Sequence, residues 1–193
     1  MSPRPLIFIS AVSKELKSAR LLVSNTLQFL GYEPVWQDIF GTEQGDLREM
    51  LRNLAYALWY QGKYAVAKVE YRDVINISTT VLGPEHPQTL WTRRGLANVL
   101  REQGQYAQAE TEYREVVKVE DNGLGKEHPE TLQTSYNLAL CLMAENKPDE
   151  AKEFAHRAAN GAKINLGRNH PDTVKYEKFW QDLQTTNSAP QPK

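Results

Sequence analysis

Three segments of the chain share one motif at a constant spacing. The motif reads LGPEHPQTL from Leu82, LGKEHPETL from Leu124 and LGRNHPDTV from Leu166, so each copy begins 42 residues after the one before. Two further motifs keep this period: QGKYAVA from Gln61 with QGQYAQA from Gln103, and NLAYAL from Asn53 with GLANVL from Gly95 and NLALCL from Asn137. Self-similarity at a fixed period of this length is typical of solenoids, in which each unit packs on its neighbours.

Each unit predicts two helices joined by a tight turn. Pro87 suits the first turn of a helix, because its φ is fixed and its missing N–H would have no helical partner. His86 is expected to be extended before that proline, which separates this helix from the preceding one. Gly104 is expected to end the first helix of the unit. A left-handed residue is then expected after each second helix, at Gly83, Gly125 and Gly167.

Two sets of positions refine this prediction. Small residues recur where the paired helices should cross closely, at Ala67, Ala109 and Ala151. The third unit has Asn146 and Pro148 where the earlier turns have Gly and Tyr, which predicts a less regular turn. The stretch from residue 45 to 64 reads as one amphipathic helix that closes the front segment and opens the array.

The motifs LG-x-x-HP-x-T and NLA…QG-x-Y-x-x-A resemble the tetratricopeptide repeat, in the longer variant found in kinesin light chains and many bacterial proteins. The resemblance implies a mainly α fold, a right-handed superhelical α-solenoid of helix-turn-helix repeats. It spans residues 47–184 as three repeats and a capping helix, HPDTVKYEKFWQDL. Residues 185–193 contain Pro, Ser and Asn without periodic apolar residues, so we expect a disordered tail.

The same resemblance implies a protein-interaction scaffold that binds a peptide or partner protein on the first helices of its repeats. Asn53 and Asn137 match the asparagine that typically contacts the peptide backbone in this family, whereas Gly95 replaces it in the middle repeat. We expect an acidic or aromatic ligand, because arginines favour carboxylates. The candidate contacts are Arg52, Asn53, Tyr56 and Trp59 in repeat one, Trp91, Arg94, Asn98 and Arg101 in repeat two, and Gln133, Tyr136 and Asn137 in repeat three.

The front segment, residues 1–46, predicts a small β-α-β unit. LIFIS and EPVWQ read as strands, and the helix between them is capped by Ser13 and ended by Gly31. FIS, SKEL…AR, GYEPVWQD and the loop from Gly41 to Gly45 resemble the start of a TIR domain. In NAD-cleaving TIR domains the catalytic glutamate follows a third strand. Since the repeats begin where that strand should be, no catalytic residue is carried over and we predict no enzyme.

An alternative role is self-association through this segment. Two parallel strands and one helix leave sheet edges open, which can pack on the first repeat or pair with a second copy as a homodimer. A remnant of an NAD-cleaving enzyme would lack its catalytic glutamate.

Charge and composition exclude two classes of partner. A net charge of −1, without a basic run, recruits neither nucleic acid nor an anionic membrane. No apolar stretch is long enough to span a bilayer, and the single cysteine, Cys141, is typical of a reducing cytoplasm. We therefore expect a cytoplasmic protein in which Cys141 is a buried core residue.

No cofactor or metal is predicted. The recurring histidines, His86, His128 and His170, lie one repeat apart, too far for one zinc ion whose ligands must all be about 2 Å away. His156 and the pair Glu120–Asp121 are expected on solvated helix faces.

Overall fold

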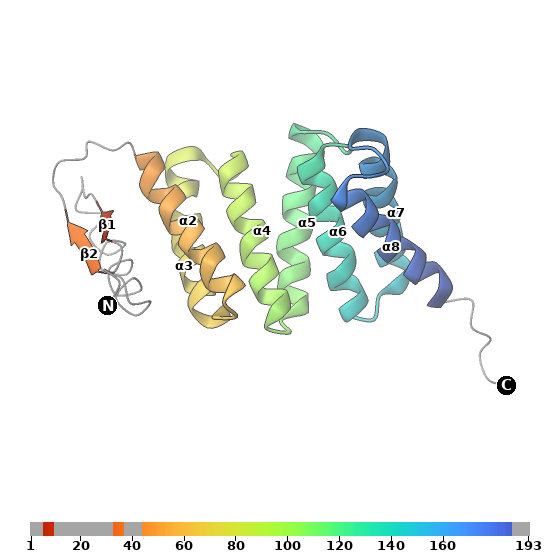
Figure 1. Ribbon diagram of the computed structural model, residues 1–193, viewed down its shortest axis with the longest axis horizontal. Helices are drawn as coiled ribbons and strands as arrows, with labels where there is room; N and C mark the ends of the chain where they lie inside the picture. Colours follow the sequence, from red (N-terminus) through yellow and green to blue (C-terminus); the bar gives the residue numbers. More distant parts are fainter. Residues whose placement is uncertain (1–5, 10–32, 37–43, 187–193) are drawn as a thin grey trace. The chain divides into compact units, whose positions relative to one another are not determined.

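The structure, a computed structural model, describes residues 6–9, 33–36 and 44–186 (Figure 1). The chain divides into two compact units, Met1–Val81 and Leu82–Lys193. The first contains β1 (Leu6–Ile9), β2 (Glu33–Trp36), α2 (Gln44–Tyr60) and α3 (Tyr64–Leu82). The second contains α4 (Pro87–Glu102), α5 (Tyr106–Gly123), α6 (Pro129–Ala144), α7 (Pro148–Asn165) and α8 (Pro171–Thr186).

In the first unit, β1 and β2 form a two-stranded parallel sheet in which Leu6 pairs with Glu33 and Ile9 with Trp36. Both strands lie where the sequence predicted them, and their parallel pairing agrees with the predicted unit. The helix expected between Ser13 and Gly31 and residues 41–43 of the expected loop lie outside the described residues. The end of that loop is wrong, because Gln44 and Gly45 already belong to α2. The predicted domain boundary at residue 46 stays a prediction.

The single helix expected from residue 45 to 64 is wrong, because two helices meet there. α2 ends at Tyr60 and α3 begins at Tyr64. Between them Gly62 has a φ of +74°, a left-handed conformation that glycine adopts without steric cost. The Lys63 N–H then donates to the Leu58 carbonyl at 2.9 Å, which satisfies a carbonyl at the end of α2. This is the helix-turn-helix arrangement of repeat one.

The turn of repeat three is as regular as the turn of repeat two, so the expected irregularity is wrong. Asn146 adopts a φ of +60°, close to the +73° of Gly104. Lys147 N–H donates to Leu142 at 2.9 Å, as Gln105 N–H donates to Leu100 at 2.9 Å. Asparagine tolerates the left-handed region better than other residues with a side chain, so it replaces glycine here without a change of turn.

The connectors between repeats are built around their histidines. His86 and His128 are extended, with φ/ψ of −65°/139° and −67°/139°, and each precedes the proline that starts a first helix. The Nδ1 atom of each histidine accepts the N–H two residues later: Gln88 at 3.2 Å, Glu130 at 3.3 Å and, for His170, Asp172 at 3.2 Å. These histidines are helix N-caps. The connector glycines Gly83, Gly125 and Gly167 have φ of +97°, +96° and +85°, as predicted.

Repeat three packs tightly because the second helix is lined by small residues. α7 buries Ala151, Ala155, Ala158, Ala159 and Ala162. Gly161 lies so close to α6 that an added Cβ would be 2.6 Å from Leu132 Cδ2 and 2.6 Å from Glu127 Oε2. Ala67, Ala109 and Ala151, the predicted crossing positions, are all fully buried.

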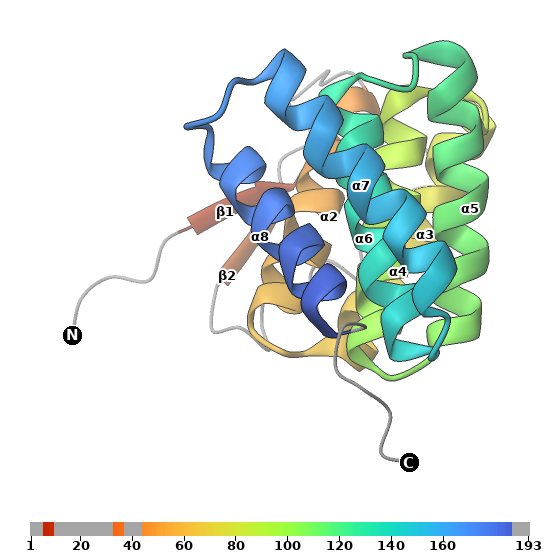
Figure 2. The same ribbon diagram turned by 90° about the vertical axis from the view of Figure 1, so that its right-hand side faces the viewer.

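Figure 2 looks onto α7 and α8, which run side by side. Tyr176 of α8 is buried against Tyr136, Ala158 and Ala162. Gln181 and Gln184 of α8 correspond, one 42-residue period earlier, to Ala139 and Leu142 of α6, which are both buried. Gln181 and Gln184 are exposed, so α8 is polar where α6 is apolar. α8 extends to Thr186, two residues into the predicted tail, and residues 187–193 lie outside the described part of the chain.

Candidate functional site

The first helices of repeats two and three bring two amide side chains together. Asn98 of α4 and Asn137 of α6 are half-buried, and Asn137 Nδ2 donates to Asn98 Oδ1 at 3.2 Å. The Tyr113 hydroxyl donates to the same oxygen at 2.5 Å. Within the described residues, Asn98 Nδ2 and Asn137 Oδ1 have no hydrogen-bond partner and are not buried. These two residues, the amide pair, therefore hold one free donor and one free acceptor in place.

The surroundings of the amide pair include other predicted contacts. Arg101 lies one turn after Asn98 on α4, with 17% of its side chain exposed, and its Nη2 donates to Glu102 at 2.7 Å. Trp91 is half-buried and Gln133 is exposed, and by helical spacing they share the faces of Asn98 and Asn137. The structure thus groups most of the predicted contacts of repeats two and three on one face.

Tyr136 serves packing more than contact with a partner. It is 7% exposed, its ring stacks on Tyr176 with centroids 4.5 Å apart, and Phe179 meets it edge-on at 5.4 Å. The Lys175 ammonium lies 4.6 Å from the centre of the Tyr136 ring. Lys175 is exposed, so this cation-π contact presents a positive charge beside α6 that the sequence did not single out.

The predicted contacts of repeat one belong to the first unit. Asn53 and Tyr56 of α2 are exposed, Tyr56 by 47%. Its ring lies 5.5 Å from that of Trp59, which is half-buried. Arg52 is mostly buried and forms an ion pair with Glu49 at 3.4 Å. Asn53 and Tyr56 therefore form the accessible part of this predicted set.

Arg94 is placed differently from the other predicted contacts. It is 4% exposed and forms ion pairs with Glu130 and, at 3.5 Å, with Glu120. Its Nη1 also donates to the Glu130 carbonyl at 3.2 Å and to the Thr134 hydroxyl at 3.3 Å. Arg94 therefore joins α4 to α5 and α6, and its burial leaves it out of the accessible face.

The solvated position expected for Glu120 is wrong. Glu120 is 2% exposed, and its Oε2 has no hydrogen-bond partner among the described residues. Burial raises the pKa of Glu120 to about 7, against the opposing effects of the Thr134 hydrogen bond and the Arg94 charge. Its neighbour Asp121 is half-buried and forms an ion pair with Arg157 of α7.

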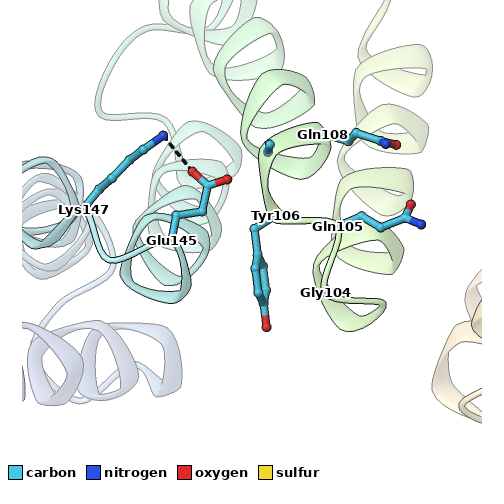
Figure 3. A pocket seen from close by; sticks show the side chains of 7 residues that line it. Gly104, Gln105, Tyr106, Gln108, Glu145 and Lys147 are labelled. Carbon is cyan, nitrogen blue, oxygen red and sulfur yellow. Dashed lines mark ion pairs between the residues drawn. The ribbon is translucent and has the colours of Figure 1, made fainter.

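A shallow pocket of about 490 Å³ lies at the inter-helix turns of repeats two and three (Figure 3). Figure 3 shows Tyr106 on one side of it and the ion pair of Lys147 with Glu145, 2.8 Å long, on the other. Lys147 also bonds Glu110 at 2.6 Å. Because these charges already satisfy one another, the pocket offers little to a ligand.

No metal or nucleophilic centre emerges in the described residues. They contain no group of three or more His, Cys, Asp or Glu side chains that could hold a metal ion. Cys141 is buried, as predicted, and its thiol donates to the Tyr106 carbonyl at 3.3 Å. Burial raises its pKa to about 11, which disfavours the reactive thiolate. His156 is exposed, and its ring lies 5.0 Å from that of Trp180. None of the described helices is long and apolar enough to cross a membrane.

The family is shown by comparison with known proteins. A tetratricopeptide repeat model matches residues 46–122 and again 96–164, which together make up more than half of the chain. The chain belongs to the tetratricopeptide repeat family. A comparison with curated sequences found no match.

Solved structures share the fold. The nearly identical TPR-like repeats of a Podosopora anserina protein classed with kinesin light chains give a TM-score of 0.69 at 24% identity, over 76% of this chain and 69% of that chain. The Yersinia enterocolitica type III secretion translocator chaperone SycD gives 0.58 at 17% identity, over 77% of this chain and 91% of its own. PcrH, solved in complex with the chaperone-binding region of PopD, gives 0.58 at 15% identity, over 78% and 99%.

The predicted solenoid of helix-turn-helix repeats is therefore confirmed, as is its likeness to kinesin light chain repeats. The handedness of the superhelix concerns both units together and stays a prediction. Nothing in these comparisons supports the TIR-like resemblance of residues 1–46.

Proposed function

We propose that this protein is an interaction scaffold whose second unit binds an extended segment of a partner protein across α4 and α6. The observation that carries the proposal is the amide pair. Its outward donor, Asn98 Nδ2, and outward acceptor, Asn137 Oδ1, complement the C=O and N–H of an extended peptide backbone. PcrH, which shares the fold and was solved in complex with the chaperone-binding region of PopD, supports this class of function.

The geometry also explains how the middle repeat can take part despite Gly95. Asn98 lies one helical turn after Gly95 and is fixed by Tyr113 and Asn137. An amide held by two hydrogen bonds loses less conformational entropy when a ligand binds than a free one. In this proposal Asn98 supplies the amide that Gly95 lacks.

Charge near the amide pair favours acidic residues in the partner. Arg101 lies one helical turn after Asn98 on α4, and Lys175 lies over the ring of Tyr136, the residue before Asn137, whereas Arg94 is buried and excluded. Gln133 and Trp91 add a polar and an aromatic contact. We therefore keep the prediction of an acidic or aromatic ligand, on a smaller set of residues, and include no catalytic step. A cytoplasmic location remains part of this proposal.

Replacing Asn98 with aspartate tests the function directly. The aspartate keeps an oxygen for Tyr113 and Asn137 to bond, but loses the outward donor. Peptides selected by the full chain from a displayed random library should be rich in acidic and aromatic residues. Their affinity for Asn98→Asp, measured by calorimetry, should fall at least tenfold, because one hydrogen bond is lost and the new carboxylate repels acidic ligands.

A matched control is Gln108→Glu, which adds the same charge on exposed α5 outside this face. It should leave affinity unchanged. Selection of no peptides, or equal binding by Asn98→Asp, would contradict the proposal.

Self-association is a second candidate, favoured by the parallel pairing of β1 and β2. Among the described residues each of these strands has a single neighbour, which leaves edges for further pairing. The full chain should then be a dimer by light scattering, and a shortened protein that begins at Gly45 a monomer. A full-length monomer at high concentration counts against this role. A TIR-like signalling role, or a remnant of an NAD-cleaving enzyme, rests on the sequence resemblance of residues 1–46 alone.

A further inference from the structure

α7 covers one side of the two helices before it, and the equivalent surface one repeat later is open. α7 packs on α6 and is joined to α5 by ion pairs. Leu132 of α6 is fully buried there, whereas its equivalent 42 residues later, Val174 of α8, is 54% exposed. Among the described residues no helix covers α7 and α8 in this way (Figure 2). We call this surface the open face; it consists of Lys152, His156 and Lys163 of α7 and Val174, Trp180 and Gln181 of α8.

The covered surface shows what holds a helix in this position. Three ion pairs join α5 to α7 and the residue before it: Glu110 with Lys147 at 2.6 Å, Arg114 with Glu150, and Asp121 with Arg157. Between these charges α7 turns a row of buried alanines toward α6. The covering helix therefore carries a base, an acid and a base at residues 147, 150 and 157, which are relative positions 1, 4 and 11, with small residues between them.

The open face has different charges at the equivalent positions. The three α5 residues of these ion pairs correspond, 42 residues later, to Lys152, His156 and Lys163. Lysines thus replace both acids, and histidine replaces the arginine. The Lys163 ammonium lies 3.1 Å from the Glu177 carboxylate of α8, but 42% of the Lys163 side chain is exposed and its three donors can bond a second carboxylate. A helix like α7 would bring its own bases against these lysines, so like charges disfavour it.

Apolar and amide groups make up the rest of the open face. A cavity of about 260 Å³ lies between α7 and α8, and its lining includes His156, Trp180 and Gln181. Trp180 is half-buried, and the His156 ring is tilted by 57° to it with centroids 5.0 Å apart. Val174 and Trp180 offer apolar contact, and Gln181 offers hydrogen bonds to a polar side chain. The open face therefore fits a helix of mixed character with small residues at its centre.

We propose that the open face binds an acidic α-helix of a partner protein, which lies on α7 and α8 as α7 lies on α5 and α6. Carboxylates at relative positions 1, 4 and 11 of that helix meet Lys152, His156 and Lys163, and its small residues pack on Val174 and Trp180. Complementary charge selects this partner. None of the described helices has acidic residues at all three of these positions, so a second copy of the chain matches poorly. The site is separate from the amide pair and does not rest on it.

The test uses the full chain and two peptides with blocked ends. The acidic peptide has the sequence of residues 147–165 with Lys147→Glu and Arg157→Glu, so it keeps the alanines of α7 and presents acids to both lysines. The natural peptide is residues 147–165 without change. Calorimetry should give a dissociation constant on the order of 0.1 mM for the acidic peptide, and the natural peptide should bind at least tenfold more weakly. The backbone amide signals of Val174 and Gln181 should shift in NMR titrations.

Reversing the charge of the open face tests whether charge selects the helix. In a chain with Lys152→Glu and Lys163→Glu, the natural peptide should bind more tightly than the acidic peptide, because its two bases now meet carboxylates. A difference in helix content between the peptides cannot produce this reversal. The matched control, Lys118→Glu with Lys126→Glu, changes two exposed lysines outside the open face and should leave the acidic peptide the tighter binder. Val174→Gln removes an apolar contact and should weaken both peptides.

Three further results decide the proposal. Asn98→Asp disrupts the amide pair and should not change binding of the acidic peptide, so this proposal and the proposed function can fail separately. Equal binding of the two peptides by the full chain, or no reversal in the chain with both lysines replaced, would overturn the proposal. Self-association of the full chain without peptide, if Lys152→Glu with Lys163→Glu abolishes it, would assign the open face to a second copy and overturn the proposal as well.

Discussion

Replacing Arg94 with alanine is expected to lower the free energy of unfolding by about 3–5 kcal/mol, the usual cost of removing one partner of a buried ion pair. Arg94 is 4% exposed, forms ion pairs with Glu120 and Glu130, and donates a hydrogen bond to Thr134. Without it, Glu120 would lose the ion pair that offsets the cost of its burial. Urea denaturation followed by circular dichroism measures the loss.

The size of this loss should depend on pH. The pKa of folded Glu120 is raised from the usual 4.5 to about 7, so the folded chain binds this proton more tightly than the unfolded chain. The stability linked to that proton is complete below the unfolded pKa and is lost as the pH rises through 7. Removing Arg94 should therefore cost most at pH 8, where Glu120 is ionised, and least at pH 5, where it is mostly protonated.

Two further variants make this prediction specific. Arg93→Ala removes the neighbouring arginine, which is bonded to Glu112 and Glu115 nearer the surface, and should cost less than about 1 kcal/mol. Adding Glu120→Gln to Arg94→Ala should recover part of the loss at pH 8, because the unpaired charge is gone. Equal losses for Arg93→Ala and Arg94→Ala at pH 8 would contradict the structural role given to Arg94.

The second large effect is expected at Gly161. Alanine there would place its Cβ 2.6 and 2.9 Å from the two terminal carbons of Leu132 and 2.6 Å from Glu127 Oε2. The Glu127 side chain is exposed and can move, but Leu132 is fully buried. Forcing α6 and α7 apart should destabilise the fold by about 1–3 kcal/mol, after the gain in helix propensity is subtracted. Thermal unfolding followed by circular dichroism measures the change.

Gly123→Ala is the matched control, since Gly123 is also helical but nothing lies within 4 Å of its added Cβ. It should be neutral or stabilising by up to about 1 kcal/mol. A Gly161→Ala protein as stable as Gly123→Ala would mean that α6 and α7 separate without cost.

The fold was predictable because the motifs recur at a constant period. Helices assigned in one repeat can therefore be transferred to the equivalent residues of the others. The period placed the first and second helices and the left-handed glycines at Gly83, Gly125 and Gly167. It did not show what the connector histidines do. Their place directly before a helix-starting proline was the available signal, because the residue before the first helical position is the one that caps.

Two errors came from treating a substitution or a charge as exceptional. Asn146 was expected to disturb its turn, although asparagine is the usual alternative to glycine at a positive φ. Glu120 was assigned to solvent by its charge. Yet Tyr113, Val117 and Glu120 follow each other at steps of four and three residues, so the helical stripe itself placed Glu120 inside. Its partner Arg94 lies on the preceding helix of the same repeat. The apolar pattern of each helix shows which face is buried, but not which residues of two helices form an ion pair.

The candidate site was predictable only in part. The family register identified Asn137 and the faces of α4 and α6, but not that Asn98 and Asn137 bond each other through one oxygen. Tertiary hydrogen bonds of this kind depend on the distance between helices, which the sequence does not state.

The polar surface of α8 has a consequence for how molecules of this protein meet. A solenoid helix that is exposed and as apolar as the inner helices presents a face on which another copy can pack, and such head-to-tail contacts do not close but continue into fibres. Gln181 and Gln184 occupy the positions where α6 has buried Ala139 and Leu142. With amides there, copies of the chain gain little by packing on this face of α8, so head-to-tail association through α8 is disfavoured.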